Sequence, residues 1–209
     1  MRSLRFRLLA ATLVALLVAL LLAGFLLAGL FRDHVTRQFG DTLTAQLDQV
    51  TARLEFDATG QPHIDAQTLT DPRWSRPYSG LYWQVDGGVG ARQRGVLRSR
   101  SLWDATLELP GDALADGVVH RHEVAGPGGA RLLLVERTVT RDDPAATPWR
   151  LLVAADLRET ETAVDRFNEV LLASMAVLFG LLCAAAVAQV AVGLAPLRAL
   201  QRAVAAIHD

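Results

Sequence analysis

Two closely spaced histidines are the first candidates for metal chemistry in the sequence. His120 and His122 are two residues apart, so on a β-strand both would lie on the same side. Two imidazoles on one side can hold zinc or copper, or respond to acid. Two ligands leave a metal site incomplete, however, and Glu123 would point the other way. A solvated strand face is therefore the favoured interpretation, and His120 and His122 remain weak metal candidates.

A pair of carboxylates precedes Pro144. Asp142 and Asp143 carry the oxygen ligands that divalent cations prefer, and the pair could also approach lipid headgroups. Aspartate is common in turns because its side chain bonds the local backbone, and that role is a sufficient explanation here. Asp142 and Asp143 are thus a second pair of weak metal candidates, and no metal site is assigned.

Arginines and aromatic side chains make up the candidate ligand-binding residues. Arg98 and Arg100 alternate along an expected strand and would suit an anionic ligand or a periplasmic protein. A solvated face paired with acidic residues is the alternative. Tyr82 and Trp103 could line a small pocket, with core packing as their alternative. These four residues are the ligand candidates, and both alternatives remain open.

Several kinds of chemistry are absent from the sequence. Ser99 and Ser101 have no His and Asp partners in a hydrolase pattern, and we find no glycine-rich phosphate loop, zinc-ligand spacing or basic nucleic-acid patch. We therefore expect no catalytic residue, no cofactor and no nucleic-acid partner in these 209 residues. The single cysteine, Cys183, has no partner in the chain, so the fold must form without disulfides.

Two long apolar segments flank all of these candidates. Residues 8–31 contain no charge, and neither do residues 170–197. A bilayer core of about 30 Å needs about 20 helical residues, so we expect membrane helices at 8–31 and 170–194. The first run is longer than the apolar region of a signal peptide, about 7–15 residues. It is therefore expected to stay in the protein.

The placement of arginine predicts the orientation in the membrane. The chain has no lysine, and basic residues dominate both ends: Arg2, Arg5 and Arg7, then Arg198 and Arg202. Residues 32–169 hold 16 arginines against 21 acidic residues. Basic flanks stay cytoplasmic, so residues 1–7 and 195–209 are expected inside. Residues 32–169 are then a periplasmic domain, and the chain lies in a bacterial inner membrane.

A helical stripe of apolar residues follows the first membrane segment. Its members recur every three or four residues: Val35, Phe39, Leu43, Leu47, Val50 and Leu54. The stripe could pack on its own domain or form a seam between two copies, and both remain open. Asp156 and Glu159 resemble a capping box that starts a second helix, leading into the second membrane segment.

Short runs of aromatic and branched residues lie between these helices. Residues 57–77 are rich in turn formers, and about five strands are expected after them, separated by turns. Their ranges are 80–86, 96–103, 118–124, 131–140 and 149–156. Hairpin-length spacing favours an antiparallel sheet, and a long helix precedes it. The fold class is therefore α+β, with two transmembrane helices flanking the periplasmic domain.

Heptad spacing marks the cytoplasmic end. Pro196 closes the second apolar segment, and four apolar residues follow at spacings of three, four and three: Leu197, Leu200, Val204 and Ile207. The pattern is still running at Asp209. We expect either a fragment of a longer protein or a short helical tail.

Two resemblances rest on these segments. Pro196-Leu197-Arg198-Ala199-Leu200 after a membrane helix resembles the start of a HAMP linker, with Pro196 and the heptad residues transmitting the signal. The motifs Asp71–Trp74, Pro77–Val85 and Arg98–Asp104 resemble the periplasmic sensor region of proteobacterial two-component sensor histidine kinases. The layout of the segments is similar along nearly the whole chain.

The resemblance implies a function that these residues alone cannot perform. It implies a PAS/PDC-like sensor domain in a membrane-embedded homodimer that receives an unknown periplasmic ligand or protein. In the parent kinase, ATP and Mg would support histidine autophosphorylation, and the phosphoryl group would pass to a response regulator. The alternative is a standalone bitopic binding or adaptor protein without kinase activity.

Overall fold

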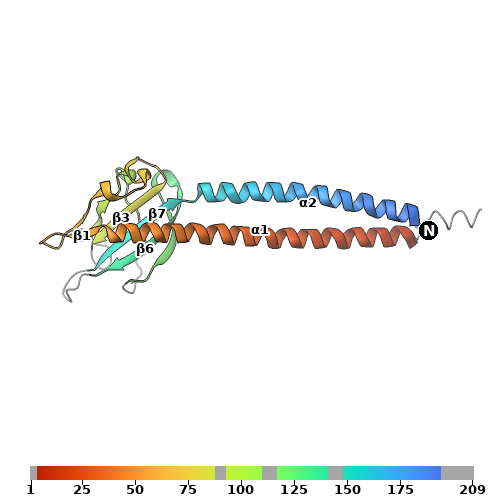
Figure 1. Cartoon of the computed structure of the whole chain (residues 1–209), viewed down its shortest axis with the longest axis horizontal. Helices are drawn as coiled ribbons and strands as arrows, with labels where there is room; N and C mark the ends of the chain where they lie inside the picture. The colour runs from red at the N-terminus through yellow and green to blue at the C-terminus, as the bar shows by residue number, and fades with distance from the viewer. Residues whose placement is uncertain (1–3, 88–92, 110–116, 141–147, 194–209) are drawn as a thin grey trace, which may run out of the picture. The chain divides into compact units, whose positions relative to one another are not determined.

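The computed structural model of the chain describes residues 4–87, 93–109, 117–140 and 148–193. Two compact units are present (Figure 1). The first, which we call the sheet unit, is His34–Thr162, and the second, the helical unit, contains the residues before and after it. Two helices, α1 (Leu4–Ala52) and α2 (Arg158–Gly193), have residues in both units. The amphipathic stretch after residue 31 therefore continues the first apolar helix, as its spacing predicts.

A five-stranded antiparallel sheet forms the centre of the sheet unit. Its strands lie in the order β4-β3-β7-β6-β5. Their bounds are β3 (Leu81–Gly87), β4 (Gln93–Arg98), β5 (His120–Ala125), β6 (Arg131–Val139) and β7 (Trp149–Asp156). The central strand β7 pairs with β3 on one side and β6 on the other, so Val153 lies between Trp83 and Val135. The expected α+β class and antiparallel pairing are confirmed.

Helix α1 covers one face of this sheet. Its residues Leu43, Leu47 and Val50 are at most 2% exposed and share a core with Trp83 and Val153 of the sheet. The apolar stripe of the sequence therefore packs on its own domain. That outcome removes these three side chains from any seam between two copies.

The opposite face of the sheet has an apolar cluster of its own. It contains Tyr82, Leu102, Leu107, Leu132, Leu134, Leu152 and Ala154. Because side chains alternate between the two faces, β3 is covered on both, and all seven of its residues are buried. Strand β3 is thus covered on both faces, whereas the edge strands β4 and β5 have exposed residues.

A buried charge cluster interrupts this second face. The Glu136 side chain is fully buried; its Oε1 lies 2.8 Å from Nε2 of His122 and its Oε2 lies 2.7 Å from Nε of Arg150. A buried carboxylate is tolerated where cationic and hydrogen-bonding partners replace its lost hydration. The Glu136 contacts therefore hold β5, β6 and β7 in one register on this face.

A second buried acid lies on the same face in β3. Asp86 is 1% exposed, and its Oδ1 accepts bonds from Nε2 of Gln84 at 2.9 Å and from the backbone N–H of Gly95 at 2.6 Å. Burial raises the pKa of the Asp86 carboxyl above its ordinary value, although these bonds lower it in part. The ionised form is therefore penalised in the folded chain.

Replacing Asp86 with asparagine keeps an oxygen acceptor and removes the buried charge. We expect Asp86→Asn to match or exceed the unfolding free energy of the wild type at neutral pH. The advantage should shrink as the pH falls, because an acid with a raised folded pKa destabilises the fold only above its unfolded pKa. Urea unfolding of the full chain in detergent, followed by tryptophan fluorescence at pH 7 and pH 4, measures both effects.

Asp86→Ala is the matched control for this substitution. Alanine removes the acceptor and leaves the N–H groups of Gln84 and Gly95 without their bond, which costs about 1–3 kcal/mol for a buried donor. A loss of stability in Asp86→Asn as large as in Asp86→Ala would contradict the expectation, since it would mean that the charge itself stabilises the fold.

The helical unit contains two apolar segments that lack a covering layer. The helical stretches Leu9–Ala52 and Arg158–Gln189 are each long and apolar enough to include a membrane span. Side chains such as Leu21, Leu22 and Phe25 are 57–78% exposed. An exposed apolar surface of this extent needs a partner or a lipid environment. These two segments are the candidate spans.

Within the helical unit α1 and α2 touch at two levels. The rings of Phe31 and Phe167 stack with their centroids 3.9 Å apart. Gly24 is buried, and a Cβ placed there would collide with the sulfur end of Met175. The glycine therefore allows the two helices to approach closely, as small residues do in membrane helix pairs.

Three local expectations are corrected by the structure. The helical stripe was expected to run to Leu54, but α1 ends at Ala52 and Leu54 begins β1 (Leu54–Phe56), which forms a small hairpin with β2 (Pro62–Ile64). The segment 57–77, expected to be rich in turns, holds β2 and two 3₁₀ turns, η1 (Ala66–Thr68) and η2 (Pro72–Ser75). The strand expected over 96–103 stops at Arg98. The chain turns there because the Ser99 hydroxyl accepts the Trp83 N–H and bonds Ser101, and η3 (Arg100–Leu102) follows.

The expected capping box is only half formed. The Asp156 side chain accepts the Arg158 N–H at 2.8 Å, from one residue before Leu157, whose carbonyl accepts the first helical bond. The Asp156 N–H, which Glu159 would need to bond, donates instead to the carbonyl of Gly80 at 2.8 Å. Because the Asp156 N–H bonds Gly80, it is not available to the Glu159 carboxylate, and Glu159 does not complete the capping box.

Candidate functional site

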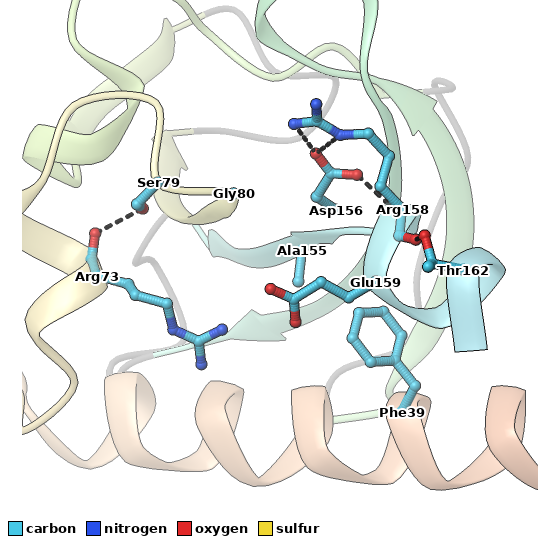
Figure 2. A pocket seen from close by; sticks show the side chains of 9 residues that line it. All are labelled: Phe39, Arg73, Ser79, Gly80, Ala155, Asp156, Arg158, Glu159 and Thr162. Carbon is cyan, nitrogen blue, oxygen red and sulfur yellow. Dashed lines mark hydrogen bonds and ion pairs between the residues drawn. The ribbon is translucent and has the colours of Figure 1, made fainter. Parts of the chain in front are cut away.

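A cavity of about 450 Å³ lies where β7 ends and α2 begins (Figure 2). Its volume falls within the range of small-molecule pockets, about 300–1,000 Å³. The lining consists of Phe39, Arg73, Ser79, Gly80, Ala155, Asp156, Arg158, Glu159 and Thr162. Phe39 belongs to α1, and the last three of these residues belong to α2. Both long helices thus contribute to one hollow of the sheet unit.

Arg73 forms one side of the cavity and is held in place by its own turn. Asp71 accepts the Arg73 backbone N–H at 2.9 Å and starts η2, with Pro72 as its first residue. The same carboxylate accepts Nη2 of Arg73 at 2.7 Å and Nε at 3.1 Å. These side-chain bonds lower the pKa of Asp71 below its ordinary value. The guanidinium is therefore fixed by the backbone and the side chain together.

Asp156 and Arg158 form a second ion pair at the opposite side. Oδ2 of Asp156 lies 2.7 Å from Nε and 2.6 Å from Nη2 of Arg158. Burial raises the pKa of Asp156, but the bonds from the Arg158 side chain and backbone outweigh it and leave the pKa below its ordinary value. Because the charges of Asp156 and Arg158 neutralise each other, the pair forms part of the cavity wall and offers little net charge to a ligand.

Gly80 makes the approach of β3 to β7 at this wall feasible. Its φ is +87°, a conformation that glycine adopts without strain. A Cβ at this position would lie 3.3 Å from the Cβ of Asp156. The preceding Ser79 donates its hydroxyl to the carbonyl of Arg73 at 2.7 Å. The rim between Arg73 and Asp156 is thus tied down by the backbone.

Opposite charges face each other across the cavity. Figure 2 shows the Arg73 guanidinium and the Glu159 carboxylate pointing into the space from opposite sides, with the Phe39 ring beside Glu159. The bond to Asp71, and then the charges of Asp71 and Glu159, raise the pKa of Arg73. No ion pair within 4.0 Å joins Arg73 to Glu159 in the part of the chain that the structure describes. The space between the two charges is open.

One curated protein matches more than half of the chain. It is the "Sensor protein kinase CarS" of Pseudomonas aeruginosa, which is 30% identical over 128 residues, or 61% of this chain. The chain is similar to part of a sensor kinase. It spans about a quarter of the length of that relative, since the match covers 25% of it. No family model matches the chain, and no solved structure does.

None of the four ligand candidates from the sequence lines the cavity, although Tyr82 bonds Gly80 of its lining. Arg100 lies over the ring of Trp103, 5.6 Å from its centroid, and Trp103 is 52% exposed. Arg98 donates to the carbonyl of Ala105 at 3.3 Å. Tyr82 is 3% exposed in the apolar cluster of the second face, where its hydroxyl accepts the Gly80 N–H at 3.2 Å. The structure thus brings Arg100 and Trp103 together and gives Tyr82 a place in the core.

The paired histidines lie on one side of β5, as their spacing predicts. Their rings are 6.4 Å apart, and His122 bonds the buried Glu136. Among the described residues no group of three His, Cys, Asp or Glu side chains is placed to hold a metal ion. Asp142 and Asp143 fall outside the described residues, as do Pro196, Leu197, Leu200, Val204 and Ile207. Those metal and signalling assignments stay predictions.

Sequence reasoning missed the residues that line the cavity. Arg73 lies in a motif that served only to support the resemblance, and Glu159 was assigned to a cap. The signal that could have found Arg73 is the Asp71-Pro72-Arg73 run, since an aspartate two residues before an arginine can cap a turn and fix the side chain. Nothing in the sequence places Glu159 opposite it.

Proposed function

We propose that the chain is the input half of a two-component sensor histidine kinase. In this proposal the sheet unit binds a signal outside the cell and passes it to the kinase part through α1 and α2. The similarity to a sensor kinase supports the class. The observation that carries the proposal is the cavity, because side chains of both helices line it. A bound molecule would therefore act directly on the two elements that also contain the apolar segments.

The membrane arrangement is part of this proposal. Segments 8–31 and 170–194 cross the inner membrane, residues 32–169 are periplasmic, and both ends of the chain are cytoplasmic. The exposed apolar residues of the two candidate spans support the crossing. The arginine bias supports the orientation. The residues from 195 onward then begin a HAMP-like helix that leads to the kinase part.

The domain is PAS/PDC-like in this proposal. Counted from β3, the five strands of the main sheet lie in the order second, first, fifth, fourth, third. An open antiparallel sheet in this order, with a long helix before it, is the arrangement expected of such a sensor domain. The partner of the complete protein would be a response regulator, with ATP and Mg used in the kinase part.

A chimera tests the function. The chain is joined, at its HAMP-like segment, to the cytoplasmic part of the Pseudomonas aeruginosa relative, and autophosphorylation with labelled ATP is measured in membrane vesicles. We expect a phosphorylated chimera whose rate changes at least twofold when Leu47→Ala loosens α1 from the sheet. Leu30→Ala, on the exposed side of the same helix, is the control. A rate indifferent to Leu47→Ala would contradict a signalling role for the sheet unit.

The proposed homodimer predicts a pattern of cross-links along α1. Gln38, Ala45 and Ala52 are exposed and seven residues apart, whereas Leu43 and Leu47 are buried in their own domain. With Cys183 replaced by alanine, cysteines at the three exposed positions should cross-link two copies in oxidised membranes, and cysteines at the buried positions should not. If a cysteine at no position from 34 to 52 cross-linked two copies, that result would contradict a dimer interface on α1.

A further inference from the structure

We propose that the cavity beside α2 binds a free α-amino acid, with its carboxylate on Arg73 and its ammonium group on Glu159. This inference rests on the proposed function, since it names the chemical class of signal for the same site. It starts from the arrangement of Arg73, Glu159 and Phe39 around one hollow.

The Arg73 guanidinium has one edge left for a carboxylate. Its bonds in the described part of the chain run from Nε and Nη2 to Asp71. A guanidinium has five N–H donors, so Nη1 and the second proton of Nη2 remain for a ligand. Paired donors of this kind recognise a carboxylate in two-point fashion. Because Asp71 fixes the group, little side-chain freedom is lost on binding.

Glu159 supplies the complementary acceptor. Its side chain is exposed, and in Figure 2 its carboxylate points back across the cavity towards Arg73. No direct ion pair joins Glu159 to Arg73 among the described residues, so a group can enter between the two charges. An ammonium group has three donors, and the Glu159 carboxylate can accept them.

The other charges of the lining argue against ligands of a single sign. The lining carries two acidic and two basic side chains, of which Asp156 and Arg158 are paired with each other. Arg73 is paired with Asp71 through one edge of its guanidinium, so its other edge and the Glu159 carboxylate are the charged groups that face the space. An anion without an ammonium group would place its charge near Glu159, and a cation without a carboxylate would lie near Arg73. Like-charge contacts of this kind discriminate against wrong ligands. A zwitterion satisfies both signs at once.

The rest of the lining leaves space for a side chain. Ala155, Gly80 and Ser79 are small, and the Phe39 ring lies next to Glu159. A cavity of about 450 Å³ holds a molecule the size of an amino acid together with bound water. A bound ligand would contact Phe39 of α1 and Glu159 of α2, so it would act on both helices.

Binding is measured with the full chain in detergent and the twenty standard L-amino acids as probes, each at millimolar concentration. The readouts are thermal stability and calorimetric titration. We expect at least one to raise the melting temperature and to bind with a measurable Kd. For the strongest binder, the corresponding amine without the carboxylate and the corresponding acid without the ammonium group should each bind at least tenfold more weakly. Equal binding of either analogue, or no binding by any of the twenty, would overturn the proposal.

Matched variants locate the site. Arg73→Gln and Glu159→Gln should each weaken binding at least tenfold, whereas Arg73→Lys should retain part of it. Glu161→Gln is the control for Glu159, because Glu161 lies on the same helix but pairs with Arg131 at 2.6 Å. Arg121→Gln is the control for Arg73, because Arg121 also pairs with an aspartate, Asp41 at 2.9 Å, but does not line the cavity. Loss of binding in the controls equal to that in the cavity variants would place the ligand elsewhere.

The chimera separates this inference from the proposed function. If no amino acid binds but autophosphorylation still responds to Leu47→Ala, the ligand class is wrong and the sensor function stands. If an amino acid binds in the cavity but leaves autophosphorylation unchanged, the site stands and the signalling role fails.

Discussion

Replacing Glu136 with alanine is expected to lower the free energy of unfolding of the sheet unit by about 3–5 kcal/mol. The carboxylate is fully buried and lies 2.7 Å from Nε of Arg150, which is itself only 9% exposed. Removing the acid takes from the buried Arg150 guanidinium the carboxylate that lies 2.7 Å from its Nε, and takes a partner from His122. Because each of the three residues comes from a different strand, the damage spreads across β5, β6 and β7.

Urea unfolding of the full chain in detergent measures this loss. All four tryptophans lie in the sheet unit, and Trp74, Trp83 and Trp149 are buried, so their fluorescence follows its unfolding. Glu123→Ala is the matched control: Glu123 also pairs with an arginine, Arg131 at 2.8 Å, but its side chain is 62% exposed. We expect the control to unfold close to the wild type. If Glu123→Ala and Glu136→Ala lowered the free energy of unfolding by similar amounts, burial would not be the reason for the large loss expected at Glu136.

Leu47→Ala should destabilise the same unit by about 2–5 kcal/mol. Leu47 is 0% exposed on α1 and belongs to the core that the helix shares with the sheet. Truncation removes buried apolar surface and opens a hole between two rigid elements that cannot fully collapse. The same fluorescence measurement detects the change. It should also make α1 easier to displace, which is why this variant serves in the chimera.

Two further variants define the cause of that loss. Leu30 is on the same helix but is 64% exposed, so Leu30→Ala should leave the unfolding of the sheet unit unchanged. Leu47→Met keeps the volume and should cost less than about 1.5 kcal/mol. If Leu47→Met were as damaging as Leu47→Ala, the loss would not come from the missing volume.

The elements with a repeating pattern could be predicted from the sequence. Apolar residues every three or four positions placed α1 on its core, and alternation with regular turns gave the five strands and their antiparallel pairing. The hairpin β1–β2 was missed because its strands are three residues long and one contains Pro62. Proline and short length both remove the usual strand signal.

The charged sites depend on information that the pattern does not carry. His120 and His122 were expected on one side of a strand, and they are, but the partner of His122 follows from the register that sets β5 against β6. Glu136 follows four apolar residues of β6, Leu132–Val135, and nothing local marks Arg150 or His122 as its partner. Arg73 and Glu159 come from distant parts of the chain and line one cavity only in the folded domain, where Gly80 lies close to Asp156 at the end of β7.

The central position of β7 has a mechanical consequence. This strand has a hydrogen-bonded ladder on both sides, and two residues after its last residue α2 begins. Sliding β7 along its own axis would require two ladders to break together, so the strand resists shear more than an edge strand such as β4 or β5. Helix α2 thus follows a strand of the sheet that resists sliding, and only Leu157 lies between the two elements. A displacement of β7 would therefore reach the first residues of α2 in the sheet unit, 158–162, directly.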